Sequence, residues 1–194
     1  MGKLYCILGR SGSGKSSICD KVVNEISIKK IITDTTRPMR DGEIDGVDYN
    51  FVSINSFIDK LSKDKYIAPK TFRNWRYGID TNQIDLSTSD CIIVIDPNGY
   101  YDLIHTCGIN NVKGILLEVD SKELLRRVIK RDNDMKEVAR RFLADEEDFE
   151  EVLSDKNIYK VENNNGCEWV TVGIISALIK HDFDLTKLYN TQED

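Results

Sequence analysis

The sequence predicts an α/β protein in which a central parallel β-sheet is covered by helices on both faces. Continuous apolar runs at residues 4–8, 91–95 and 114–119 are typical of strands that are buried on both faces. Segments with helical spacing or a helix-capping residue follow these runs. Such an alternation of buried strands and helices indicates parallel strands joined by crossover helices.

The expected strands are spread along the whole chain. They cover residues 4–8, 31–32, 49–52, 91–95, 114–119 and 158–161. Residues 34–48 are charged and contain glycine, which is typical of a functional loop rather than of core. Residues 66–86 are mixed in character and predict short strands and turns.

Helices are expected between these strands. They cover residues 16–26, a segment after Ser53, residues 98–105, a segment after Ser121, and residues 134–153 and 168–180. Ser53 and Ser121 are typical N-cap residues, because a serine hydroxyl accepts a hydrogen bond from the free N–H groups of the first turn. The acidic run at residues 145–151 is expected to be solvated helix surface, and residues 183–194 a partly frayed tail.

Composition indicates one soluble domain spanning residues 1–194. The hydrophobic content is 40%, the charged content is 31% and the net charge is −6 with a pI near 5.1. An acidic surface disfavours nucleic acid as a partner, and no apolar run approaches membrane length. The five cysteines are widely spaced without a C-x-x-C pair, which argues against a disulfide framework and a zinc site. The N-terminal residues do not resemble a signal peptide, so we expect a cytoplasmic protein. We expect it to be a monomer or a homodimer.

A glycine-rich loop directly follows the first expected strand. Residues Gly9 to Ser16 read G-R-S-G-S-G-K-S, which fits the pattern G-x-x-x-x-G-K-[ST]. Between a strand and a helix, this pattern directs backbone N–H groups at a chain of phosphates, while the lysine reaches the β/γ-phosphates. A plain glycine turn is the alternative, but it does not require the Lys-Ser pair. The expected ATP-binding residues here are Gly9, Arg10, Ser11, Gly12, Ser13, Gly14, Lys15, Ser16 and Ser17, with the Ser16 hydroxyl as a ligand of Mg²⁺.

A second and longer pattern narrows the reaction. Residues 35–52 read T-T-R-P-M-R-D-G-E-I-D-G-V-D-Y-N-F-V. This segment resembles the acceptor-binding segment of guanylate kinases, T-T-R-x-x-R-x-G-E-x-x-G-x-[DE]-Y-x-F, at every fixed position. Tyr77-Gly78, the arginines at 127 and 131, and Arg141-Phe142 are similar to further family patterns, so the resemblance covers about residues 3–150.

The resemblance implies a three-layer P-loop nucleoside monophosphate kinase fold. It divides the single domain into a core, a small mixed β subdomain that binds the nucleoside monophosphate (NMP), and a helical lid. The core is expected at residues 1–32, 90–125 and 142–182, the NMP-binding subdomain at 33–89 and the lid at 126–141.

Phosphoryl transfer brings two polyanions together, so positively charged side chains are its main requirement. Arg37 and Arg40 lie three residues apart beside a glycine turn and can grip one phosphate with planar guanidinium groups. The expected catalytic residues are Lys15, Arg37, Arg40, Arg131 and Arg141. The resemblance implies acceptor binding by Thr33, Arg37, Arg40, Glu43, Tyr49, Tyr77 and Asp96, and donor binding by Arg127 and Asn163.

The base-reading positions depart from the family pattern. Ala68 stands where the family has a glutamate that accepts from the N–H groups of guanine, Val94 where it has an aspartate, and Ile79 where it has a small residue. A buried N–H without an acceptor costs about 1–3 kcal/mol. These departures favour a different or modified base, whereas the complete acceptor segment at residues 35–52 favours ATP- and Mg²⁺-dependent phosphorylation of GMP or dGMP, which is the leading interpretation. Two alternatives stay open, namely a kinase for another or modified nucleotide and a non-catalytic guanylate-kinase-like binding module.

Overall fold

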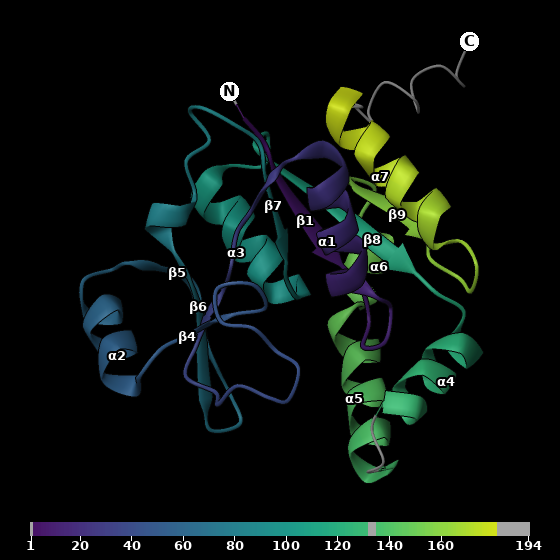
Figure 1. Cartoon of the computed structure of the whole chain (residues 1–194), viewed down its shortest axis with the longest axis horizontal. Helices are drawn as coiled ribbons and strands as arrows, with labels where there is room; N and C mark the ends of the chain where they lie inside the picture. Colours follow the sequence, from purple (N-terminus) through teal and green to yellow (C-terminus); the bar gives the residue numbers. More distant parts are fainter. Residues whose placement is uncertain (1, 132–134, 182–194) are drawn as a thin grey trace.

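The structure is a computed structural model that describes residues 2–131 and 135–181, without the side chains of Arg131, Glu137 and Arg141. Its centre is a five-stranded, wholly parallel sheet with the strand order β2-β7-β1-β8-β9 (Figure 1). The strands are β1 (Leu4–Leu8), β2 (Lys29–Lys30), β7 (Cys91–Val94), β8 (Val112–Glu118) and β9 (Ile158–Glu162). The predicted parallel sheet is confirmed.

Helices cover both faces of this sheet, as expected for three layers. Tyr5 and Ile7 of β1 face the helices α1 (Lys15–Ile26) and α7 (Glu168–His181). Leu4, Cys6 and Leu8 face the opposite side, toward α3 (Pro97–Cys107) and α6 (Glu150–Ser154). Alternate residues of β1 therefore pack into two separate apolar cores, one on each face of the sheet.

A second, four-stranded sheet lies beside the first (Figure 1), with the order β4-β3-β6-β5. Its strands are β3 (Asp34–Thr35), β4 (Asn50–Phe51), β5 (Tyr66–Phe72) and β6 (Trp75–Asp80), and only the β3–β4 pair is parallel. Helix α2 (Ile54–Ser62) packs on it, capped by Ser53 as predicted, and the short 3₁₀ helix η1 (Thr81–Gln83) leads back to the core.

The long helix that was expected at residues 134–153 is two helices. Helix α5 (Met135–Asp148) ends where Phe149 turns inward to the core, and α6 begins one residue later. Helix α4 (Ser121–Arg131) precedes them. Its first N–H groups are capped by the carboxylate of Asp120, which accepts from Lys122 and Glu123, and not by Ser121 as predicted.

Smaller differences concern the edges of the fold. The strand predicted at residues 31–32 lies two residues earlier, at β2, and β3 forms inside the segment expected to be a loop. The tail predicted at residues 183–194 lies outside the described residues. Within the part of the chain that the structure describes, no helix is both long and apolar enough to span a membrane.

Candidate active site

The glycine-rich loop joins β1 to α1 at the carboxyl edge of the parallel sheet. Gly12 and Gly14 have φ values of 83° and 88°, which favour glycine. A Cβ atom at Gly12 would come within 2.7 Å of Val128, and one at Gly14 within 2.8 Å of Asn163. Both the backbone conformation and the close neighbours therefore require glycine at these positions.

Lys15 is folded back over this loop. Its ammonium donates to the carbonyl oxygens of Gly9 at 2.5 Å and Arg10 at 3.2 Å. Ser16 lies exposed in the first turn of α1, and Ser17 donates to Glu168 at 2.9 Å. The lysine and the serine thus lie at the loop where the sequence predicts phosphates and a metal ion.

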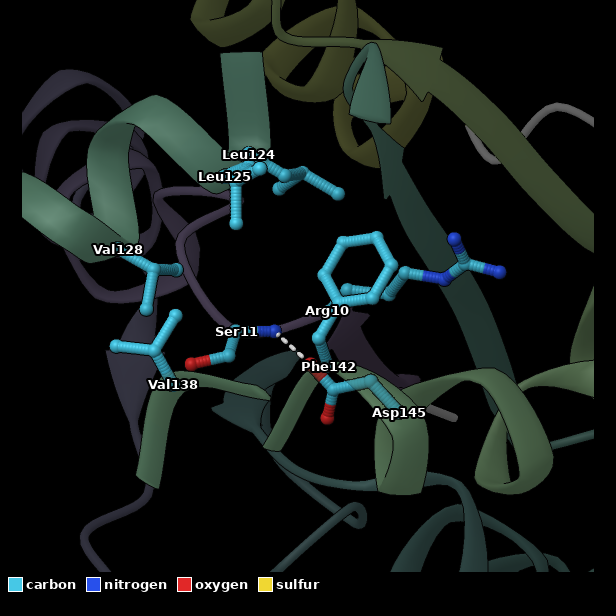
Figure 2. Close-up of a pocket in the computed structure, with 8 residues that line it drawn as sticks. All are labelled: Arg10, Ser11, Leu124, Leu125, Val128, Val138, Phe142 and Asp145. Carbon is cyan, nitrogen blue, oxygen red and sulfur yellow. Dashed lines mark hydrogen bonds between the residues drawn. The ribbon is translucent and has the colours of Figure 1, made fainter. Parts of the chain in front are cut away.

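A small apolar pocket separates this loop from the helices α4 and α5 (Figure 2). Leu124, Leu125, Val128, Val138 and Phe142 form its walls. At its floor, the carboxylate of Asp145 on α5 accepts a hydrogen bond from the backbone N–H of Ser11 at 2.5 Å. Burial raises the pKa of this carboxyl above its usual range.

Asp145 was missed by sequence reasoning. It begins the acidic run that was expected to be solvated surface, yet its side chain is partly buried against the loop. Its partner lies 134 residues away along the chain, so no local pattern could have indicated the contact.

Asn163 and Arg127 support the loop from the other side. The buried Asn163 amide donates to the carbonyl oxygen of Ser13 at 2.7 Å. Arg127 donates to the Asn163 carbonyl at 3.0 Å and to Glu123 at 2.8 Å. The structure therefore brings both predicted donor-binding residues close to the loop, where Asn163 contacts the loop backbone and Arg127 contacts Asn163.

The second sheet carries a buried arginine. Arg37 is 7% exposed and makes a two-pronged ion pair with Glu43, at 2.7 and 3.0 Å. This hydrogen-bonded pairing raises the pKa of Arg37 and lowers the pKa of Glu43. Glu43 also accepts a hydrogen bond from the backbone N–H of Arg40 at 2.8 Å. One carboxylate therefore contacts the guanidinium of Arg37 and the backbone of Arg40, the two predicted phosphate-binding arginines.

Aromatic rings surround this arginine. Its guanidinium carbon lies 5.4 Å from the ring centroid of Tyr49 and 5.6 Å from that of Phe51. Tyr77 packs edge-on against Tyr49, with the ring centroids 6.1 Å apart. Burial raises the pKa of Tyr49, so its hydroxyl stays protonated and able to donate.

The remaining predicted acceptor residues lie nearby in sequence or at the sheet edge. Thr33 precedes β3, and its carbonyl oxygen accepts from the N–H of Asn50. Asp96 caps α3 by accepting from Gly99 at 2.9 Å, and its other oxygen contacts the ammonium of Lys70. The side chains of Arg131 and Arg141 lie outside the described residues, so their predicted roles stay predictions.

A glycine-rich loop of P-loop sequence at the carboxyl edge of a parallel sheet, with helices on both faces, places the chain in the class of P-loop kinases. The family model for guanylate kinase matches residues 1–166. The chain belongs to the guanylate kinase family.

Individual relatives agree with this assignment. The chain is 34% identical to the guanylate kinase of Legionella pneumophila (strain Paris) over 110 residues, which cover 54% of this chain and 52% of that protein. It is 30% identical to the guanylate kinase of Helicobacter hepaticus over 138 residues, or 69% and 68% of the two chains. The match thus spans about half the length of the Legionella relative.

A solved structure shares the fold. The crystal structure of guanylate kinase from Anaplasma phagocytophilum superposes with a TM-score of 0.65 over 93% of this chain and 86% of that chain, at 23% identity.

Proposed function

We propose that this chain transfers the γ-phosphate of ATP to GMP or dGMP. The observation that carries the proposal is the arrangement of two anion sites in one domain. One is the glycine-rich loop with Lys15, and the other is the Arg37–Glu43 pair beside two tyrosines on the second sheet. A kinase that joins two nucleotides needs one such site for each.

The chain's own residues bind, orient and neutralise charge. Loop N–H groups and Lys15 hold the donor phosphates, while Arg37, Arg40, Tyr49 and Tyr77 hold the acceptor phosphate. Arg131 and Arg141 supply further positive charge on the transferring group, and Arg127 and Asn163 keep the loop in shape. A phosphate acceptor is already ionised, so the transfer requires no general base.

The donor set fits Mg²⁺ as a cofactor. The exposed Ser16 hydroxyl is a hard oxygen ligand at the start of α1, and Mg²⁺ prefers few protein ligands together with phosphate oxygens and water. When bound, the ion neutralises charge on the donor phosphates.

The proposal includes the division of the domain that the sequence predicts. The core comprises residues 1–32, 90–125 and 142–182, the acceptor subdomain residues 33–89, and the lid residues 126–141. We further propose a cytoplasmic monomer or homodimer whose partners are nucleotides rather than nucleic acid or membranes.

A coupled assay of ADP release tests this function. Purified protein with ATP and Mg²⁺ is offered each common NMP and dNMP in turn, and turnover with GMP or dGMP is expected. Lys15→Met removes the loop cation and is expected to lower kcat at least 100-fold (roughly 3 kcal/mol). Lys21→Met on the same helix, whose ammonium pairs with Glu168, is the matched control. Absence of turnover with every acceptor would favour the binding-module alternative.

A further inference from the structure

The outer side of α7 is apolar although it faces solvent. Trp169 is 74% exposed, Val170 is 62% exposed and Ile174 is 44% exposed. Val170 and Ile174 lie four residues apart and therefore on the same side of the helix, next to Trp169. The opposite side of α7, with Val172 and Ile175, is buried in the core. A helix that is apolar on both sides is typical of a helix that is also covered on both sides.

The elements that contact α7 leave this outer side open. α7 packs on α1 and β9, and Figure 1 shows it along the outside of the parallel sheet. The ammonium of Lys21 on α1 lies 5.1 Å from the ring centroid of Trp169, but most of the indole is still exposed. A contiguous apolar patch that contains an exposed tryptophan is typical of a surface that binds another protein.

Gly173 lies in the middle of the outer side of α7. A Cβ atom at this position would meet no other atom of the described residues within 4 Å, so packing within the chain does not require glycine. Glycine also destabilises a helix relative to alanine. A glycine does, however, allow a second backbone to approach closely. Gly173 therefore gains a role when another helix crosses α7 at this point.

The charges at the two ends of α7 have opposite signs. Residues 169–179 contain no charged side chain, whereas Glu168 precedes them and Lys180 follows them. Ile174 stands midway between these two residues, so a two-fold axis near Ile174 relates two antiparallel copies of α7 with Glu168 of each copy close to Lys180 of the other. Glu168 already pairs with Lys21, but a carboxylate has about four acceptor positions. Parallel copies would bring like charges and like ends of the helix dipoles together.

We propose that the outer side of α7 binds the same surface of a second copy of this chain, as an antiparallel pair of helices. Gly173 and Ile174 then lie at the two-fold axis, and Trp169 of each copy packs on the C-terminal half of α7 of the other. A surface centred on so few side chains is smaller than the roughly 800 Å² that each partner buries in a standard interface. We therefore expect a weak dimer with a Kd of about 10 μM. The inference goes beyond the proposed function, and its test does not depend on catalysis.

Sedimentation velocity of the full chain over a range of concentrations around this Kd tests the inference. A dimer is expected to form as the concentration rises. Ile174→Glu places a charge at the two-fold axis and is expected to raise the dimer Kd by about 100-fold or more. Ile58→Glu on α2 is the matched control, because Ile58 is also 44% exposed, and it should leave the Kd unchanged.

A charge reversal tests the antiparallel arrangement. Lys180→Glu sets two carboxylates close together at each end of the pair and is expected to raise the dimer Kd about fivefold. Lys63→Glu is the matched control, since Lys63 stands at the C-terminal end of α2 and pairs with the exposed Asp59. Thermal denaturation of each variant checks that it is folded.

The fluorescence of Trp169 reports directly on the surface. The chain contains two tryptophans, so Trp75→Phe leaves Trp169 as the single emitter. Its emission is expected to move to shorter wavelength as the concentration rises, because the indole leaves water when the dimer forms. The midpoint of this change should coincide with the midpoint of dimerisation by sedimentation.

The other outcomes overturn the proposal and point to different occupants. A dimer whose Kd is unchanged in Ile174→Glu would use another surface. A chain that stays monomeric, with Trp169 emission typical of a buried indole at every concentration, would mean that another segment of the same chain covers this side. A monomer that sediments with vesicles of phosphatidylcholine and phosphatidylglycerol would assign the surface to lipid. A monomer that does neither would show that this side stays exposed.

Discussion

The backbone N–H of Ser11 donates a hydrogen bond to the carboxylate of Asp145, with the nitrogen and the oxygen 2.5 Å apart, so the helix α5 is hydrogen-bonded to the glycine-rich loop. A carboxylate at a loop amide takes a position that resembles that of an anionic ligand. Lys15 also contacts the loop carbonyls in this arrangement. The bond therefore joins α5 to the loop at the cost of a negative charge close to the proposed donor site.

Neutralising Asp145 is expected to strengthen ATP binding. Asp145→Asn keeps an acceptor for the Ser11 N–H but removes the charge that repels a triphosphate. The expected change is a fall of about fivefold in the Kd for ATP, or about 1 kcal/mol. Titration with a non-hydrolysable ATP analogue measures it, and Glu146→Gln on the exposed side of α5 is the control. An unchanged or higher Kd would mean that Asp145 does not oppose the nucleotide.

Asp145 also predicts a pH dependence of stability. Burial raises its pKa in the folded state, so the folded protein binds this proton more readily than the unfolded chain does. The charged Asp145 lowers the free energy of unfolding by its full amount above the pKa of the folded state. This loss disappears as the pH falls toward the pKa of the unfolded state. In urea titrations, the stability gain of Asp145→Asn over wild type should therefore shrink between pH 7 and pH 4. A gain that grows at lower pH would contradict the raised pKa.

The sequence predicts the core of the fold better than its edges. β1 and β7 are buried continuous apolar runs, and their strand character needs no tertiary information. β3 is only two residues long and exists because it pairs with β4 and β6, which a local pattern does not contain. The break at Phe149 is likewise set by core packing, since helical spacing continues through it.

In the candidate site, too, the sequence predicts some residues and misses others. The loop from Gly9 to Ser16 and the Arg37 segment are contiguous patterns, so the sequence contains both. Asp145 contacts Ser11 and Lys70 contacts Asp96, partners that are distant along the chain, and the bulge between β5 and β6 places Ala68 in a conformation that alanine rarely adopts. Residue type alone did not distinguish either side chain from solvated charge.

Glu43 is expected to position Arg37 for the acceptor phosphate. Glu43→Gln keeps the shape but replaces a charged, two-pronged partner by a neutral one, which costs about 1.5 kcal/mol in orientation of the arginine. KM for GMP should rise about tenfold, with KM for ATP unchanged. Glu25→Gln on the exposed side of α1 is the control. A lower KM for GMP would show instead that Glu43 competes with the phosphate for Arg37.

A buried ionic network supports the second sheet. Lys60 donates to Asp34 at 2.8 Å and to Asp80 at 2.6 Å, and the hydroxyl of Tyr66 donates to Asp34 at 2.7 Å. Because Asp34 is 1% exposed, Lys60→Met leaves a buried carboxylate without its cation. Chemical denaturation should show a loss of about 2 kcal/mol, against less than about 0.5 kcal/mol for the exposed Lys63→Met. Equal losses in the two variants would contradict a stabilising role for the network.

The substitution Ala68→Gly is expected to raise the free energy of unfolding of the protein. Its φ of 50° lies in the left-handed region, which costs an L-residue about 1 kcal/mol but costs glycine almost nothing. Glycine also gives the unfolded chain more freedom, so the net gain should be about 0.5 kcal/mol. Ala177→Gly on the exposed side of α7 is the matched control and should lose about 1 kcal/mol, because its backbone is helical. Urea unfolding of both variants should thus give changes of opposite sign, and a loss at position 68 would mean that the alanine methyl contributes more through packing than its backbone conformation costs.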